Sequence, residues 1–174
     1  MVKSWVITGV CLIGAGVLCC TAAIGAGALN QQRYREKLHL TDQTDTPSEN
    51  FTAIQVALED ADLTVQAGDS VSVEAENISA DCYDVTVRDG VLRIEQRSSS
   101  LNQYTLIHLG GLSLPTAKIT LTLPEENYKS MDISASYGDC TVDGISAQTF
   151  SANLDCGDGT FQNISTENYT AKSS

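Results

Sequence analysis

Two cysteines and two aspartates near the carboxyl end are the residues whose types and spacing could support chemistry. Cys140 follows Asp139 in "YGDCTVDG", and Cys156 precedes Asp158 in "LDCGDGT". Two thiols could form a disulfide, or act as nucleophiles if a histidine lay beside them. Two carboxylates could hold a cation or work as an acid/base pair. The choice depends on the elements that position these four side chains.

A repeat of 19 residues contains all four of them. Shifting the sequence by 19 positions places one Gly-Asp pair on the other and apolar residues on apolar residues, and a third copy begins at Tyr169. The matched pairs include Met131 with Phe150, Ile133 with Ala152, Ala135 with Leu154, Thr141 with Thr160 and Val142 with Phe161. A period near 20 in a strand-rich sequence is typical of a β-solenoid. We therefore expect parallel strands stacked about 4.8 Å apart, with Gly-Asp at the corners.

The repeat would bring Asp139 and Asp158 within about 5 Å, one coil apart. That distance suits a carboxylate pair or a cation, but corner aspartates also stack without chemistry, because Asp bonds its own turn backbone. The corner role is preferred, and the two aspartates stay only as alternative metal candidates. Neither histidine, His39 or His108, has a spacing that suggests nucleophilic catalysis. We therefore assign no catalytic residue and no cofactor.

The same register places the two cysteines on opposite sides of the turn in adjacent coils. Cys140 falls on Gly159 and Cys156 on Tyr137. A turn width of about 5.5 Å and a coil spacing of about 4.8 Å give roughly 7 Å between the Cα atoms, at the outer limit for a disulfide. A Cys140–Cys156 bridge is therefore a candidate, with Cys82 as an alternative partner or an unpaired thiol. Without Cys-x-x-Cys spacing, zinc and redox sites are less favoured.

Upstream of the repeat, polar and apolar residues alternate. Between residues 53 and 75 the pattern predicts short half-buried strands separated by turns. Asp89-Gly90 lies between two β-rich runs and predicts a tight hairpin. "KITLTLP", at 118–124, predicts a further strand, and residues 97–117 predict a longer loop. No segment after residue 38 has a helical period.

This succession of motifs resembles a protein family. The "VTVRDGVLRIEQ" hairpin, the "ITLTLP" strand and the "ISASYGDCTVDGIS" and "ANLDCGDGTFQNIS" coils are similar to bacterial "putative adhesin" domains built of β-strand repeats, over roughly residues 50–174. The resemblance implies a right-handed parallel β-helix that faces the cell exterior, and it brings no catalytic residues. Family members commonly continue for several more coils. We therefore expect either a truncated chain or a pairing partner at an uncapped solenoid end.

The amino-terminal segment predicts a membrane anchor. No charged residue occurs from Trp5 to Leu29, and roughly 20 apolar residues cross a bilayer. A cleaved signal is the alternative, since "AGA" at 26–28 resembles a cleavage site, although the apolar run exceeds the roughly 7–15 residues of a signal core. Basic residues at 33–37 would favour a cytoplasmic domain. The composition of the remainder favours the outside.

Charge and composition narrow the function further. The net charge of −12 disfavours nucleic acid and anionic headgroups as partners. We expect a transmembrane anchor or uncleaved signal over residues 1–30, a juxtamembrane linker over 31–50 and a repeat domain over 51–174. The expected fold class is all-β, a right-handed parallel β-solenoid (β-helix) with coils of about 19 residues, preceded by an N-terminal transmembrane helix.

The function expected from this organisation is a non-enzymatic, extracytoplasmic interaction module of the cell envelope, adhesin-like or scaffold. The protein would hold the lipid bilayer through residues 5–29 as a single-pass membrane protein. A protein or glycan at the cell surface would be its ligand, with self-association at the uncapped end as a further contact. Two alternatives remain: a membrane-anchored component of envelope-stress sensing or signalling, and a carbohydrate-active β-helix enzyme.

Overall fold

The computed structural model describes residues 12–22, 35–36, 39–97 and 116–173. Residues 12–22 are helical and exposed. Within the described residues, no helix has the length and hydropathy needed to cross a membrane. The remainder of the predicted anchor over residues 1–30 lies outside the described part of the chain, as do His108 and most of the predicted loop over 97–117.

Strands make up most of the described residues from 39 onward. In chain order they are β1 (Leu40–Asp45), β2 (Ala53–Ala67), β3 (Ser72–Ser79), β4 (Tyr83–Arg88), β5 (Val91–Gln96), β6 (Ala117–Leu123), β7 (Asn127–Tyr137), β8 (Cys140–Asp143), β9 (Ser146–Cys156), β10 (Gly159–Gln162) and β11 (Ser165–Ser173). One short 3-10 turn, η1 (Ala80–Cys82), interrupts them. The expected all-β class is therefore confirmed for the described residues.

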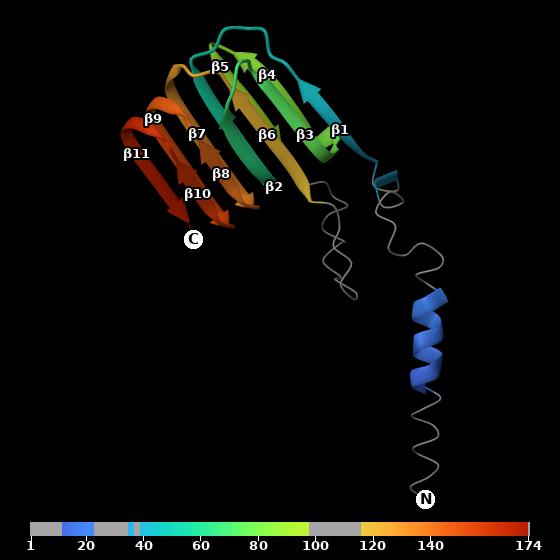
Figure 1. The fold of residues 1–174 in the computed structure, drawn as a ribbon. Coiled ribbons are helices and arrows are strands. Elements are labelled where there is room, and N and C mark those ends of the chain that lie inside the picture. The colour runs from blue at the N-terminus through green and yellow to red at the C-terminus, as the bar shows by residue number, and fades with distance from the viewer. Residues whose placement is uncertain (1–11, 23–34, 37–38, 98–115, 174) are drawn as a thin grey trace, which may run out of the picture.

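Strand β2 is the central strand, because it takes part in two parts of the sheet, which we call the first arm and the second arm. Its first half pairs in parallel with β5 and β7, and the arm continues through β9 to β11. Its second half pairs in parallel with β6 and β8, and that arm continues from β8 to β10. Antiparallel strands complete the other end, where β4 joins β5 and where β3 joins both β6 and β1. Figure 1 shows the resulting open rack of strands.

Apolar side chains from both arms form one core. Ladders of residues in register run across the strands, and in each the side chains are almost completely buried. Two such ladders are Leu92, Ile54, Met131 and Phe150 in the first arm, and Ala75, Ile119, Leu63 and Cys140 in the second. Full burial of one large apolar side chain is worth roughly 1.5–3 kcal/mol, so the stacking of ladders holds the coils together.

The predicted register is confirmed wherever a later coil lies on an earlier one. Met131 pairs with Phe150, Phe150 with Tyr169, and Val142 with Phe161, each 19 positions apart. The predicted hairpin is also present, because Arg88 pairs with Val91 around Asp89 and Gly90, whose φ angles are 53° and 74°. The expected strand at 118–124 corresponds to β6.

Two expectations about the first strands are wrong. β2 is one continuous strand of 15 residues, where the sequence predicted two strands separated by a turn. The chain bends at Glu59 and Asp60 and passes from one arm to the other without leaving the extended conformation. The linker predicted over residues 31–50 contains β1, which pairs with β3 and is therefore part of the sheet. Its Asp42 carboxylate accepts the Asn77 N–H at 3.0 Å, which fixes this edge strand.

Glycine is required at the corners that join the two arms. Gly138 and Gly157 have φ angles of 123° and 137°, which side chains rarely tolerate. A Cβ atom at Gly157 would also overlap the carbonyl oxygen of Gly138, and one at Gly138 would overlap the carbonyl oxygen of Ala61. The backbones of successive corners therefore touch directly.

We expect Gly157→Ala to destabilise the fold by at least about 3 kcal/mol, because it combines backbone strain with an overlap that neither backbone can relieve. The matched control is Gly90→Ala. Gly90 has a φ of 74° but open space around it, so its substitution should cost only about 1 kcal/mol. Urea unfolding of both variants measures the difference. Equal losses would show that the corners do not depend on close backbone approach.

Candidate functional site: the corner ladder and the mouth groove

Three aspartates stack at the corner between the arms, and we call them the corner ladder: Asp62, Asp139 and Asp158. The Asp62 carboxylate accepts the backbone N–H of Asp139 at 3.0 Å, and the Asp139 carboxylate accepts the N–H of Asp158 at 3.0 Å. From the repeat, the side chains of Asp139 and Asp158 are expected to bond the backbone of their own turns. The structure corrects this for Asp139, whose side chain bonds the backbone of the next coil instead, as the Asp62 side chain does.

The corner ladder brings Asp139 and Asp158 together, and the contact between them is a hydrogen bond that links two successive coils. One oxygen of Asp62 and one of Asp139 are engaged by backbone N–H groups along the stack. Among the described residues, no group of three or more His, Cys, Asp or Glu side chains is placed to hold a metal ion. The metal role of Asp139 and Asp158 therefore remains an untested expectation, while their hydrogen-bonding role is visible.

The two cysteines occupy different environments. Cys140 pairs with Gly159 and Cys156 with Tyr137, as the sequence register predicted. Cys140 is completely buried in the core ladder of the second arm, and Cys156 is exposed. Both are free thiols in the structure, as is Cys82. Burial raises the pKa of the Cys140 thiol to about 12, so this thiol is not a nucleophile near neutral pH.

The Gln96 side chain supplies hydrogen bonds to the corner of the first coil. No pattern in the sequence indicated this role. The Gln96 side-chain oxygen accepts the backbone N–H groups of Glu59 and Asp60, both at 3.1 Å. Its Nε2 donates to the Arg97 carbonyl at 3.0 Å and also to the Asp60 carboxylate. At only 6% exposure, Gln96 is a buried polar side chain. It supplies hydrogen bonds at a level of β2 where the described part of the chain provides no other corner.

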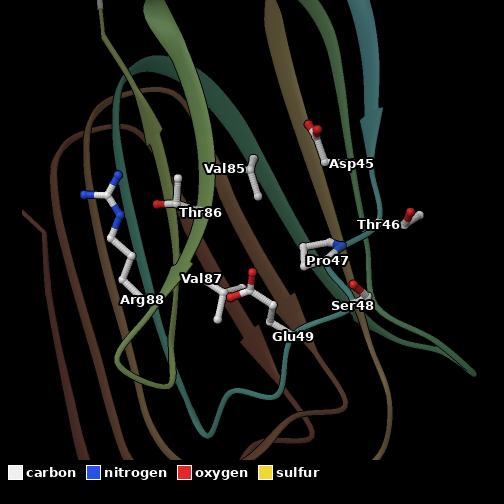
Figure 2. A pocket seen from close by; sticks show the side chains of 9 residues that line it. All are labelled: Asp45, Thr46, Pro47, Ser48, Glu49, Val85, Thr86, Val87 and Arg88. Carbon is white, nitrogen blue, oxygen red and sulfur yellow. The ribbon is translucent and has the colours of Figure 1, made fainter.

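A groove opens between the two arms at the end of the rack formed by β1 and β4, and we call it the mouth groove. It has a volume of about 390 Å³ and is lined by Asp45, Thr46, Pro47, Ser48, Glu49, Val85, Thr86, Val87 and Arg88. Figure 2 shows Val85, Pro47 and Glu49 around the opening, while Thr86 and Arg88 extend from the opposite side of β4. The groove thus combines a partly apolar wall with carboxylates on the facing segment.

Tyr83 lies at the start of β4, on the same face of the strand as Val85 and Val87. Its hydroxyl is buried without a hydrogen-bond partner among the described residues. Burial, and then the neighbouring Asp45 carboxylate, raises the pKa of this hydroxyl well above its ordinary value. The tyrosine therefore stays neutral and contributes its ring to the core beside the mouth groove.

Comparison with protein families gives one match. The family model described as Toastrack DUF4097 matches residues 51–174. A search of the curated proteins gave no match.

Comparison with solved structures gives matches at low sequence identity. A "putative cell adhesion protein" from Clostridium sporogenes is 14% identical with a TM-score of 0.50, covering 68% of this chain and 58% of that protein. A "putative adhesin" from Bacteroides fragilis is 10% identical with a TM-score of 0.33, covering 77% and 96%. A "putative lipid binding protein" from Parabacteroides distasonis is 14% identical with a TM-score of 0.30, covering 72% and 62%. The chain spans less than two thirds of the Clostridium protein, and the likeness concerns the fold.

We expect Gln96→Met to destabilise the fold by about 2–4 kcal/mol. The methionine keeps the side-chain volume but removes the acceptor of two N–H groups and the donor to a carbonyl. Gln66→Met is the matched control, because the Gln66 side chain is exposed and makes one 3.3 Å hydrogen bond to Thr122. Its expected loss is about 0.5 kcal/mol or less. Chemical denaturation measures the free energy of unfolding of both variants. Similar values would show that the hydrogen bonds of Gln96 do not stabilise the corner.

We expect Cys156, but not Cys140, to react with iodoacetamide in the native full-length protein. Cys156 is exposed, whereas Cys140 is buried with a raised pKa. Peptide mass spectrometry reads both sites, and denaturation before alkylation should release Cys140. If both cysteines are instead protected from alkylation until a reductant is added, the Cys140–Cys156 bridge is established.

Proposed function

Because this chain belongs to the Toastrack DUF4097 family, whose model covers residues 51–174, we propose that it is a non-enzymatic interaction module of the cell envelope. It acts as an adhesin-like or scaffold protein, with a protein or glycan at the cell surface as its ligand. The names of similar structures support this proposal, since they describe adhesin-like and cell-adhesion proteins.

The outer face of the first arm is the observation that carries the proposal. Outward-facing residues of β2, β7, β9 and β11 form a polar grid in register, and we call it the outer grid: Gln55, Asp132, Ser151, Thr170, Ser134, Asn153 and Lys172. Its side chains are exposed or half-buried. Neighbouring strands lie about 4.8 Å apart, and outward residues follow one another about 6.8 Å apart along each strand. The hydroxyl and amide groups therefore lie on one flat surface. Such a surface suits a ligand with many hydroxyl or amide groups.

The proposal includes a location and a detailed fold. Residues 5–29 anchor the protein in the bilayer as a single pass, and the β domain lies outside the cytoplasm. The domain is a right-handed parallel β-solenoid with 19-residue coils. The parallel pairings of β7, β9 and β11 at that offset support the coil length. The proposal also includes self-association at the solenoid end formed by β10 and β11.

We expect protease treatment of intact cells that carry the full chain to remove the β domain. The treated cells should then adhere less well to untreated cells, and the loss of adherence should follow the loss of the domain. Asn153→Arg should reduce adherence several-fold and leave the proteolytic fragments unchanged, because a bulky cation disturbs the outer grid without entering the core. Thr141→Arg is the matched control, since Thr141 is an exposed residue on the other arm.

Two results would contradict the proposal. A domain that stays intact until the cells are lysed would place it inside the cytoplasm. Adherence that is the same for Asn153→Arg, Thr141→Arg and the unaltered protein would show that the outer grid binds nothing.

A further inference from the structure

Strand β4 has an unpaired edge beside the mouth groove. Among the described residues β4 pairs only with β5. The residues of β4 that line the groove, from Val85 to Arg88, lie along this edge. An open edge with space next to it can accept an added strand, which gains main-chain hydrogen bonds without any rearrangement of the sheet.

The hairpin determines which backbone groups of β4 point to the open edge. In a two-residue hairpin the residues that flank the turn, here Arg88 and Val91, exchange hydrogen bonds. Bonded pairs then recur at every second residue, and the bond from the Arg97 N–H to the Cys82 carbonyl fits this alternation. The N–H and C=O groups of Val85 and Val87 therefore point away from β5, toward the groove.

Strand β11 has the complementary edge at the opposite end of the same arm. It pairs only with β9 among the described residues, and Tyr169 is 52% exposed. Tyr169 stacks on Phe150 and Ala171 pairs with Ala152, so both side chains face the core side of the arm. Strand β11 runs parallel to β5 and hence antiparallel to β4. In that direction the N–H and C=O groups of core-side residues point away from β9, toward the open edge.

We propose that β11 of one molecule adds antiparallel to β4 of a second copy of this chain. The bonded pairs are Tyr169 with Val87 and Ala171 with Val85. This register satisfies two requirements together: all four residues direct their backbone groups to the shared edge, and all four side chains lie on the core side of the arm. The inference rests on the self-association included in the proposed function, and it specifies the two edges that meet.

The outward side chains of the two strands match in the same register. Lys172 lies opposite Asp84, and Thr170 lies opposite Thr86. Opposite charges and threonine pairs are favourable across antiparallel strands, and like charges are unfavourable.

Glu167 completes the match with Arg88. Buried residues in β9 are three apart between Ala147 and Phe150, so the alternation is interrupted there, and β11 follows β9 in register. The extra residue brings Glu167 to the level of Arg88. In both charge pairs of the joint, Lys172 with Asp84 and Glu167 with Arg88, opposite charges therefore face each other.

The contact joins unlike ends of the molecule. Among the described residues each copy has an unpaired β4 edge at one end and an unpaired β11 edge at the other, so this joint repeats without closing. The arm of one molecule continues into the arm of the next, and linear chains of molecules follow.

Paired charge reversals test the joint in the full chain in detergent. The first variant carries Asp84→Lys with Arg88→Glu, and the second carries Glu167→Arg with Lys172→Asp. Either variant alone places like charges at both contacts, so its self-association should be at least about tenfold weaker than that of the unaltered protein. Mixing the two variants restores opposite charges at every joint and should restore large species. Sedimentation velocity over a concentration series measures both effects.

The control variant is Arg93→Glu, an equal charge reversal on β5, away from the edge, and it should associate like the unaltered protein. An unaltered protein that stays monomeric would overturn the inference, as would variants that associate normally or mixtures that do not recover. None of these outcomes changes the adherence and proteolysis results, so failure of this contact is distinguishable from failure of the proposed function.

Discussion

The fold depends on the hydrogen bonds that one coil supplies to the corner of the next. Where the chain passes from one arm to the other, its N–H groups leave the strand ladders and need new acceptors. The Asp62 and Asp139 carboxylates provide two of them, and backbone carbonyls provide others, as in the bonds from Leu63 to Asp139 and from Cys140 to Asp158. These bonds fix the spacing of the corners, so the apolar ladders on both arms stay in register.

The first coil meets the same requirement in another way. Among the described residues no corner stacks on β2 from the side of β5, which ends at Gln96. The Gln96 amide replaces the missing peptide group: it accepts two N–H groups and donates to a carbonyl, as a neighbouring backbone would. An apolar residue at this position would leave the N–H groups of Glu59 and Asp60 without this acceptor, which explains why a polar residue follows Leu92 and Ile94 at a core position.

The sequence predicted the parts of this structure that repeat or are local. Pairs such as Met131 with Phe150 follow from one constant offset, and the Asp89-Gly90 hairpin follows from the backbone preferences of two residues. Gln96 contacts residues 36 and 37 positions away, and Asp62 lies 77 positions before Asp139, with no period to connect them. The pattern between residues 53 and 75 predicted short strands separated by turns where β2 is continuous, because alternation alone does not distinguish a turn from a strand that passes between two arms.

The corner ladder also gives the molecule a direction. The Asp62 and Asp139 carboxylates each accept an N–H from the coil that follows, so the side-chain hydrogen bonds of the ladder all run in the same sense. At one end Gln96 closes the stack, and at the other Asp158 presents a carboxylate whose next N–H donor is not among the described residues. The two ends of the ladder therefore differ in chemistry: an amide lies at one end and a carboxylate at the other. The edges of β4 and β11, which are unpaired among the described residues, lie at these two unlike ends, so a contact between them extends the sheet in one direction.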